Sequence, residues 1–545
     1  MFNLFSILVS FYVTVIIIPV LRRLAANKKL LDIPDDRKIH KIPVPRIGGI
    51  GIVMGSMVPV ILWVPMTNEF KAFLIGTAIL FVFGVVDDLI NLGYKEKILG
   101  QILAIGIIIV IGDVYITNLG IWIKGELLLP SWLSIPLTFF FILGITNAIN
   151  LADGLDGLAG GICIFIFSTL ALLAYLDERS SIVICCLGIA GALLAFLRFN
   201  TFPASIFMGD AGSQFLGFSA AVMCLYLTQS QSTAIAPVLP LIILGFPILD
   251  TLTVMSERIA TGGSPFKPDL RHFHYRLLKL GFSPKEAVLG IYFFQSLIVL
   301  FSIQLRYYTE LWIVLTYFSL VLPLVLLFCI AYWKKWKLPK GAGIENLWNK
   351  FITKNMALCL EKLSLNYIRI ILPLGLIWLA VSSPIKLLGG GMAIFFMVLA
   401  ASATFWINRS VFNILFRLTS YVLAMYLLIT SQVETIFTLP FTQQTFHYLF
   451  WGSIGFSALT FLTITRFKLL EASGLDYLVI LLVISLSFLP LERVGIWHLG
   501  RVAGGMVVFL WASDILITTQ KSDLNPFSIS CLTAALILFS KYLVF

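Results

Sequence analysis

Carboxylate and amide side chains stand between apolar segments at several places in the chain. The stretch 147–161 reads NAINLADGLDGLAGG, and apolar runs flank it on both sides. Its Asp153 and Asp156 are three residues apart, so on a helical turn they lie on one face. Asp87 and Asp88 end another apolar run. Ionisable residues at membrane depth are costly and usually line a functional cavity.

A cation is needed where several carboxylates meet. A further carboxylate, Asp210, lies in FMGDAGS at the expected start of another apolar segment. Oxygen ligands suit magnesium, which typically takes one or two protein carboxylates together with substrate phosphates. Glycines in these motifs permit close backbone approach, and N–H groups at helix starts favour anions. Basic donors for phosphate are available at Lys95, Lys97, His272, His274 and Arg276.

Each motif alone has a simpler interpretation. An Asp-Asp pair at a helix end is also typical of a solvated cap, and glycines are also typical of close helix packing. A His-x-His pair is common on ordinary basic surfaces. The motifs together nevertheless predict a magnesium–diphosphate site.

The composition indicates an all-α polytopic membrane protein. The chain has 545 residues, of which 59% are hydrophobic and 12% charged, and its mean hydropathy is +0.99. Its apolar runs are about 20 residues long, the length of a membrane-spanning helix and not of a barrel strand. The net charge of +11 is explained by basic cytoplasmic loops, so no nucleic-acid partner is expected.

Apolar runs divide the chain into two membrane regions. About eleven spanning helices are expected in residues 1–335, followed by a basic cytoplasmic linker at 336–369. About seven more are expected in 370–545, a C-terminal domain of unknown function, which gives about 18 transmembrane helices in all.

The basic residues predict the sidedness of the membrane region. Lys and Arg gather in the loops after odd-numbered helices, and the loops after even-numbered helices are nearly bare. The N-terminus is therefore expected outside and the odd-numbered loops in the cytoplasm. All the polar motifs follow odd-numbered helices, which places the active site on the cytoplasmic face. These motifs occupy residues 33–49, 85–101, 147–161, 198–213 and 268–283.

The motifs resemble those of a known enzyme family. PRIGG, VVDDL, NAINLADGLDGLAGG, FMGDAGS and RHFHYRLL occur in the order seen in the polyprenyl-phosphate N-acetylhexosamine-1-phosphate transferases of glycosyltransferase family 4. These include the undecaprenyl-phosphate GlcNAc-1-phosphate transferases, which start the synthesis of O-antigen and other cell-surface polysaccharides. The resemblance covers roughly residues 1–335.

The resemblance implies a reaction, a location and partners. A UDP-sugar would give N-acetylhexosamine 1-phosphate to undecaprenyl phosphate, and UMP would leave. The enzyme would need magnesium, which manganese can replace, and would lie among the lipids of the bacterial cytoplasmic membrane. The hexosamine stays open, as does homodimer formation.

The resemblance also assigns the catalytic residues. Asp88 and Asp210 would hold magnesium, and Asp87 would act as a base or orient the acceptor phosphate. Direct in-line displacement at the β-phosphorus is favoured, with a covalent phospho-aspartate on Asp87 as the alternative. Asn91 stands where a third carboxylate sometimes occurs, so no role is assigned there.

Substrate-binding roles follow in the same way. Asn150, Asp153 and Asp156 would shape the nucleotide pocket. Lys97 would meet a phosphate, with Lys95 as its rival. The sugar-nucleotide diphosphate would contact His272, His274 and Arg276. Tyr275 departs from the family pattern, in which relatives often carry adjacent histidines.

Two other functions are compatible with parts of the sequence. A transporter also places carboxylates in a membrane, but near the midplane and beside broken helices. An inactive transferase fold could instead act in glycan export through the C-terminal region. There, Arg493 and Arg501 in the outside loop 491–505 would either form ion pairs or bind an anionic lipid-linked glycan.

Overall fold

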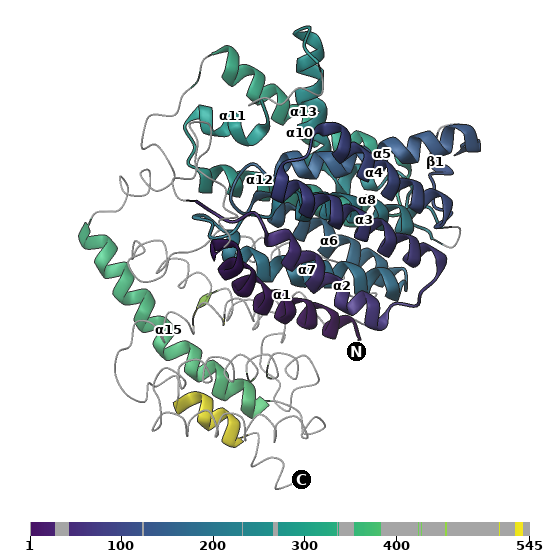
Figure 1. Ribbon diagram of the computed structural model, residues 1–545. Coiled ribbons are helices and arrows are strands. Elements are labelled where there is room, and N and C mark those ends of the chain that lie inside the picture. The colour runs from purple at the N-terminus through teal and green to yellow at the C-terminus, as the bar shows by residue number, and fades with distance from the viewer. Residues whose placement is uncertain are drawn as a thin grey trace. The chain divides into compact units, whose positions relative to one another are not determined.

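The protein forms two compact units in a computed structural model (Figure 1). One comprises Met1–Gly343 with Ser473–Leu481, and the other Ile344–Ala472 with Leu482–Phe545. The residues that the structure describes are 2–27, 43–122, 125–230, 233–264, 271–334, 336, 354–382, 423, 427, 453–454, 509, 512 and 529–537.

The regular secondary structure in the described part of the first unit is helical apart from one hairpin. Nine helices in the described residues are long and apolar enough to cross a membrane, eight of them in this unit and one in the second, which confirms the polytopic α-helical class. The helices are α1 (Phe2–Asn27), α2 (Gly48–Trp63), α3 (Asn68–Ile90), α4 (Tyr94–Val110), α5 (Ser131–Ala152), α6 (Leu158–Leu176), α7 (Ser180–Asn200), α8 (Gly209–Thr228), α9 (Pro240–Ile243), α10 (Gly245–Ala260), α11 (Phe273–Leu280), α12 (Pro284–Leu305) and α13 (Glu310–Trp333).

The ninth membrane segment expected from the sequence, at about residues 234–255, is broken into α9 and α10 around Leu244. Pro247 explains the break, because a proline cannot donate a helical hydrogen bond and its ring clashes with the carbonyl four residues earlier. That carbonyl belongs to Ile243, the last residue of α9. The segment is therefore two helices and not one continuous helix.

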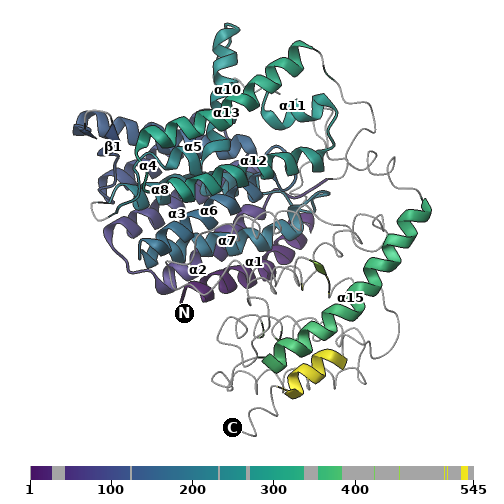
Figure 2. The same ribbon diagram turned by 180° about the vertical axis from the view of Figure 1, so that it is seen from behind.

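Helix α8 is the centre of the first unit. Every residue from Ala211 to Thr228 is buried. Figures 1 and 2 show α6 and α8 in the middle, with α1 and α2 on one side and α5 and α13 on the other. Because neighbours enclose α8, its first turn is fixed relative to the ends of several helices.

Small residues bring two neighbours against that first turn. A Cβ on Gly49 would overlap the backbone of Gly212, and a Cβ on Gly84 would overlap the backbone of Ala211. Residues of the PRIGG motif also run beside the segment before α8. The N–H of Gly49 donates to the carbonyl of Met208 at 2.7 Å. Backbones at this end of the bundle thus approach more closely than larger residues would permit.

A short antiparallel hairpin of β1 (Asn118–Trp122) and β2 (Gly125–Leu128) follows α4. It was not predicted, because its strands are too short for an alternating pattern to be recognised. Glu310 at the start of α13 accepts a hydrogen bond from the N–H of Ile121 at 2.6 Å. Gln229, directly after α8, accepts one from the N–H of Thr117 at 3.0 Å. The hairpin is therefore fixed at the C-terminal end of α8, away from the polar motifs.

The second unit is described mainly through α15 (Lys354–Ser382). The helix includes the second half of the predicted linker, because apolar residues recur there at helical spacing. Tyr367 donates to Ser453 at 2.8 Å. The loop 491–505 and most of the seven expected C-terminal helices lie outside the described residues. The buried stripe of α15 is Ser364, Ile368, Leu372, Leu376 and Leu379.

We expect opposite stability effects from two glycine substitutions. Gly290 lies inside α12 and a Cβ there meets nothing within 4 Å, so Gly290→Ala should add up to about 1 kcal/mol through helix propensity. Gly49→Ala should lower stability, because the methyl group would overlap the α8 backbone. Thermal unfolding in detergent checks both variants. A Gly49→Ala protein as stable as the wild type would contradict the packing described.

Candidate active site

The N-terminus of α8 is capped by a side chain from another helix. Asp88, near the end of α3, accepts hydrogen bonds from the N–H groups of Asp210 at 2.8 Å and Ala211 at 3.1 Å. The N-cap residue Met208 offers no side-chain cap. The sequence pattern suggested that N–H groups at this helix start serve an anion, but the structure gives these two to Asp88.

A lysine joins the other two carboxylates. Lys97 Nζ lies 2.7 Å from Asp87 Oδ2 and 2.6 Å from Asp210 Oδ2. Only 6% of the Asp87 side chain is exposed, and its Oδ1 accepts the N–H of Leu92 at 2.7 Å. The cluster thus has three carboxylates, at positions 87, 88 and 210, and one lysine, which contacts two of them. If all three are ionised, negative charge remains in excess.

The position of Lys97 is set by the helix that carries it. Lys97 and Gln101 lie four apart on α4, and so do Asp210 and Gln214 on α8. Gln101 donates to Gln214 at 3.3 Å, one turn from the ion pair. Matched polar pairs therefore fix the register of α4 against α8. Lys95, the rival candidate, is exposed.

Two predicted nucleotide-pocket residues also hold the site together. Asn150 accepts a hydrogen bond from Ser213 of α8 at 3.1 Å. Asp156 accepts one from the N–H of Ala204 at 2.9 Å. The same turn is tied to α7, because Asn200 accepts the N–H of Gly157 at 3.0 Å. The 147–161 motif and the 198–213 motif therefore meet at the start of α8.

Asp153 lies in the turn between α5 and α6. Burial raises its pKa to about 7, and the negative charges of Asp210 and Asp156 act in the same direction. The positive charge of Arg46 opposes them and favours the ionised form. Arg46 was not among the predicted site residues, although its motif, PRIGG, was recognised.

The histidines of the 268–283 motif flank the start of α11. His272 Nδ1 lies 2.9 Å from Asp250 Oδ2, and the N–H of Phe273 donates to Asp250 Oδ1 at 2.7 Å. Asp250 and His272 are both buried. Asp250 was missed by the sequence analysis; a lone carboxylate within the ninth apolar segment is the signal that could have revealed it.

The second histidine of the motif faces the turn of the 147–161 motif. The ring of His274 stacks on that of His272, with centroids 5.9 Å apart and planes at 8°. Among the described residues its buried Nε2 has no hydrogen-bond partner, and it lies where a Cβ of Gly154 would be. Burial lowers the pKa of His274 to about 4, so the ring is neutral at pH 7. Tyr275 packs against it, with centroids 4.2 Å apart.

Arg276 is held on the surface of α10 and α11. Its Nη2 lies 2.8 Å from Glu257 of α10, and its Nε donates to the carbonyl of Arg271 at 2.6 Å. Its guanidinium also lies 5.6 Å from the centre of the Phe273 ring. To bind a phosphate, Arg276 would have to leave Glu257 or contact the phosphate and Glu257 at the same time.

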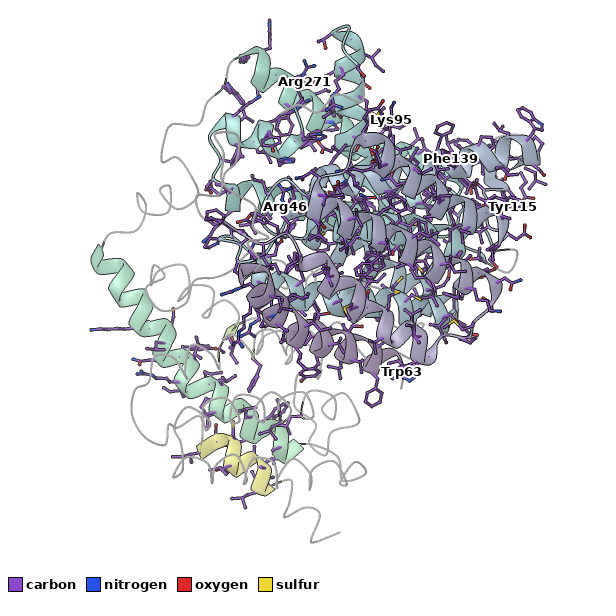
Figure 3. The ribbon with its side chains drawn as sticks, viewed as in Figure 1. Arg46, Trp63, Lys95, Tyr115, Phe139 and Arg271 are labelled. Carbon is purple, nitrogen blue, oxygen red and sulfur yellow. The ribbon has the colours of Figure 1, made fainter. Side chains whose placement is uncertain are left out.

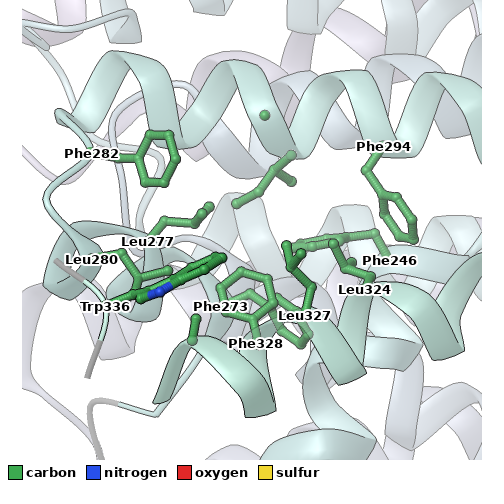
Figure 4. A pocket seen from close by; sticks show the side chains of 13 residues that line it. Phe246, Phe273, Leu277, Leu280, Phe282, Phe294, Leu324, Leu327, Phe328 and Trp336 are labelled. Carbon is green, nitrogen blue, oxygen red and sulfur yellow. The ribbon is translucent and has the colours of Figure 1, made fainter. Parts of the chain in front are cut away.

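The apolar face of α11 borders a cavity of about 570 Å³ (Figure 4). Phe273, Leu277 and Leu280 line it from α11, Phe246 from α10, and Trp336 from the segment after α13. The lining side chains are apolar or aromatic. Helix α11 is therefore bordered by an aromatic cavity on its apolar face, while polar contacts with α10 hold its start.

The described parts of the five motifs lie at the start of α8 and at the turn after α5. Asp87, Asp88 and Lys97 contact the first residues of α8, and the turn after α5 contacts α11. Within the first unit, Figure 3 shows Arg46 and Arg271 well apart from Tyr115, which lies near the other end of that unit. The arrangement combines clustered carboxylates, a lysine and neutral imidazole, which is suited to binding a phosphate-bearing substrate with a cation.

Comparison with known proteins decides the family. A model of the family described as Glycosyl transferase family 4 matches residues 70–228. A Bacillus subtilis (strain 168) protein named as a probable undecaprenyl-phosphate N-acetylglucosaminyl 1-phosphate transferase is 36% identical over 302 residues, which are 55% of this chain and 84% of the relative. The chain belongs to glycosyl transferase family 4.

Enterobacterial relatives agree with this assignment. The undecaprenyl-phosphate alpha-N-acetylglucosaminyl 1-phosphate transferase of Escherichia coli (strain K12) is 30% identical over 310 residues, 55% of this chain and 83% of that protein. The resemblance inferred from the motifs is thereby confirmed. Each of these matches leaves a large part of this family 4 chain uncovered.

The two lysines of this family 4 site allow a matched test. Lys97→Met would leave Asp87 and Asp210 without their cation, and we expect phosphosugar transfer to undecaprenyl phosphate to fall by about 10²-fold or more. Lys95→Met removes an exposed charge two residues away and should cost less than about threefold. Initial rates with both purified variants give the comparison. Equal losses would contradict the assignment of Lys97.

Proposed function

We propose that the protein transfers N-acetylhexosamine 1-phosphate from a UDP-sugar to undecaprenyl phosphate, releasing UMP. The product would be an undecaprenyl-diphosphate-linked sugar, formed in the first membrane step of a cell-surface polysaccharide. The names of the relatives support the acceptor and the sugar phosphate. The observation that carries the proposal is the cluster of Asp87, Asp88, Asp210 and Lys97 around the first turn of α8.

The donor set at this cluster fits magnesium. It consists of carboxylate oxygens with a single lysine, so a divalent cation would balance the remaining negative charge. Within the described residues no three acidic, histidine or cysteine side chains converge as a ready-made metal cage. Magnesium typically uses one or two carboxylates plus substrate phosphates, so a full protein cage is not required.

Asp88 and Asp210 are the proposed magnesium ligands. The contacts of Asp88 and the exposure of Asp210 support this proposal. Asp88 already accepts two backbone N–H groups, which fix its carboxylate and leave it further lone pairs. Asp210 is 21% exposed and is the more accessible of the pair that Lys97 joins. When bound, magnesium would polarise the diphosphate and stabilise the developing negative charge.

The chain's own residues would then bind and orient the substrates. Lys97 would hold Asp87 and Asp210 in place and offer its charge to a phosphate. Asp87 would orient the acceptor phosphate. The second pKa of a phosphate monoester is near 6, so the acceptor is already largely dianionic at pH 7 and needs little help from a base. Its oxygen would attack the β-phosphorus, and the bond to the UMP oxygen would break in line.

The donor would lie against the turn between α5 and α6. Asp153, Asp156 and Asn150 border that turn, and Arg46 brings a positive charge near Asp153. The buried Nε2 of His274 faces the same turn at Gly154. His272 and Arg276 would complete the contacts to the diphosphate, with Arg276 shared with Glu257.

The membrane arrangement follows from the basic loops. We propose a multi-pass protein of the bacterial cytoplasmic membrane, with about 18 spans, the N-terminus outside and the site in the cytoplasm. The domain division proposed from the sequence is a transferase domain at 1–335 and a separate membrane domain at 370–545. Manganese can serve in place of magnesium, and self-association into a dimer is compatible with this arrangement.

A transporter is not favoured by the geometry. Its ionic site would be expected near the middle of the membrane beside broken helices. Here Asp87 and Asp88 lie in the last turn of α3, and Asp210 is the second residue of α8. An inactive scaffold would have no need for Lys97 between two carboxylates.

UMP release tests the proposal. Purified protein, magnesium and undecaprenyl phosphate are mixed with a panel of UDP-sugars. Asp210→Asn is the preferred knockout and Asp88→Asn the second, because Asp88 also caps α8 and its loss can disturb folding. We expect magnesium-dependent release with one or more UDP-N-acetylhexosamines, reduced at least about 10²-fold in both variants. Equal release by wild type and folded Asp210→Asn, or by wild type without divalent cation, would overturn it.

A further inference from the structure

A buried carboxylate outside the cluster at α8 contacts the histidine motif. Asp250 lies in α10 and is 2% exposed. Neither its place in an apolar segment nor the resemblance to family 4 gave it a role. A carboxylate buried to this degree is costly unless its oxygens are hydrogen-bonded.

Both carboxylate oxygens of Asp250 contact the histidine motif. Oδ2 lies 2.9 Å from His272 Nδ1, and Oδ1 accepts the N–H of Phe273 at 2.7 Å. His272 is the N-cap residue of α11 and has no side-chain cap of its own. Asp250 therefore fixes the start of α11 and the ring of its N-cap residue together.

The pairing also fixes which nitrogen of His272 faces the site. A carboxylate beside Nδ1 favours a proton on that atom, so Nε2 is the nitrogen left for other partners. The His272 ring in turn stacks on His274, with planes at 8°. The buried Nε2 of His274 lies against Gly154 in the turn after α5, and no described residue bonds to it.

We infer that Asp250 is a positioning residue for sugar-phosphate transfer, which holds His272 and the stacked His274 in the orientation that meets the donor. The inference rests on the proposed function. Asp250 would not touch the reacting atoms; it would act through His272.

Substitutions separate this role from a merely structural one. Asp250→Asn keeps an oxygen for the N–H of Phe273 but no longer favours a proton on His272 Nδ1. We expect kcat/KM for the UDP-sugar to fall about 10- to 100-fold. His272→Ala should also lower it, and the double variant should lose no more than His272→Ala alone, because Asp250 acts through that ring. A double variant whose kcat/KM falls by the product of the two single-variant factors would overturn the inference.

A matched control uses another contact between the same helices. Glu257→Gln breaks the ion pair of α10 with Arg276 on α11 but leaves Asp250 and His272 in contact. In the His272→Ala background, Glu257→Gln should lower kcat/KM by the same factor as it does in the wild type. If Glu257→Gln also loses its effect in the His272→Ala background, a general loosening of α11 explains the data and the inference fails.

A spectrum independent of turnover separates failure of this inference from failure of the proposed function. The chain has five histidines, so protein labelled with ¹⁵N-histidine gives a countable set of imidazole signals. We expect a protonated Nδ1 signal at pH 7 that disappears in His272→Ala and shifts in Asp250→Asn. An inactive wild type with this spectrum would refute the proposed function while the His272–Asp250 pairing stands. Absence of the signal, or its persistence unshifted in Asp250→Asn, would refute the inference even in an active enzyme.

Discussion

The capped start of α8 is the constraint on which the site depends. Helix α8 is enclosed along its length, so its first N–H groups need partners that the preceding loop does not provide. Asp88 reaches them from α3, at 2.8 and 3.1 Å. Because Asp87 adjoins Asp88 and Asp210 belongs to the capped turn, this one contact brings three carboxylates together. Lys97 lies between two of these carboxylates, Asp87 and Asp210, and its positive charge offsets the repulsion between them.

Close helix packing makes that contact geometrically accessible. Gly84 lies one turn before Asp88 and lets α3 approach Ala211, and Gly49 lets the first turn of α2 approach Gly212. Amide side chains one turn further along α4 and α8 hold Lys97 in register. The histidine motif is organised in a similar way, with a carboxylate from α10 at the start of α11. In both places a carboxylate from one helix accepts N–H groups at the start of another helix and positions a candidate substrate-binding group.

Much of the membrane fold could be predicted because hydrophobic length is a local property. The expected segments up to residue 332 correspond to helices of the structure, since each apolar run is long enough to span a bilayer. The break at Leu244 was not predicted, although Pro247 gave a local cause. The hairpin after α4 and the early start of α15 were also missed, because short strands and a polar first half of a helix give weak patterns.

The candidate site was predictable in its residue types but not in its pairings. Charged residues in an apolar chain are conspicuous, so Asp87, Asp88, Asp210 and the histidines could be selected from the sequence. The pairings depend on contacts between segments far apart in the chain. Examples are the capping of α8 by Asp88 and the contact of Asp250 with His272. The sequence favoured Lys97 but left Lys95 as its rival, and the position of α4 against α8 brings Lys97 to the carboxylates while Lys95 is exposed.

The fate of the donor's β-phosphorus tests most directly whether this cluster transfers a sugar phosphate. A UDP-N-acetylhexosamine labelled with ³²P at the β position is supplied with undecaprenyl phosphate and magnesium, and lipid and nucleotide are separated after reaction. The label is expected in the lipid fraction in a product that also contains the sugar, while the released UMP carries none. Label that stays in a released nucleotide while sugar appears on the lipid would contradict the assigned chemistry, as would lipid labelling that Asp210→Asn leaves unchanged.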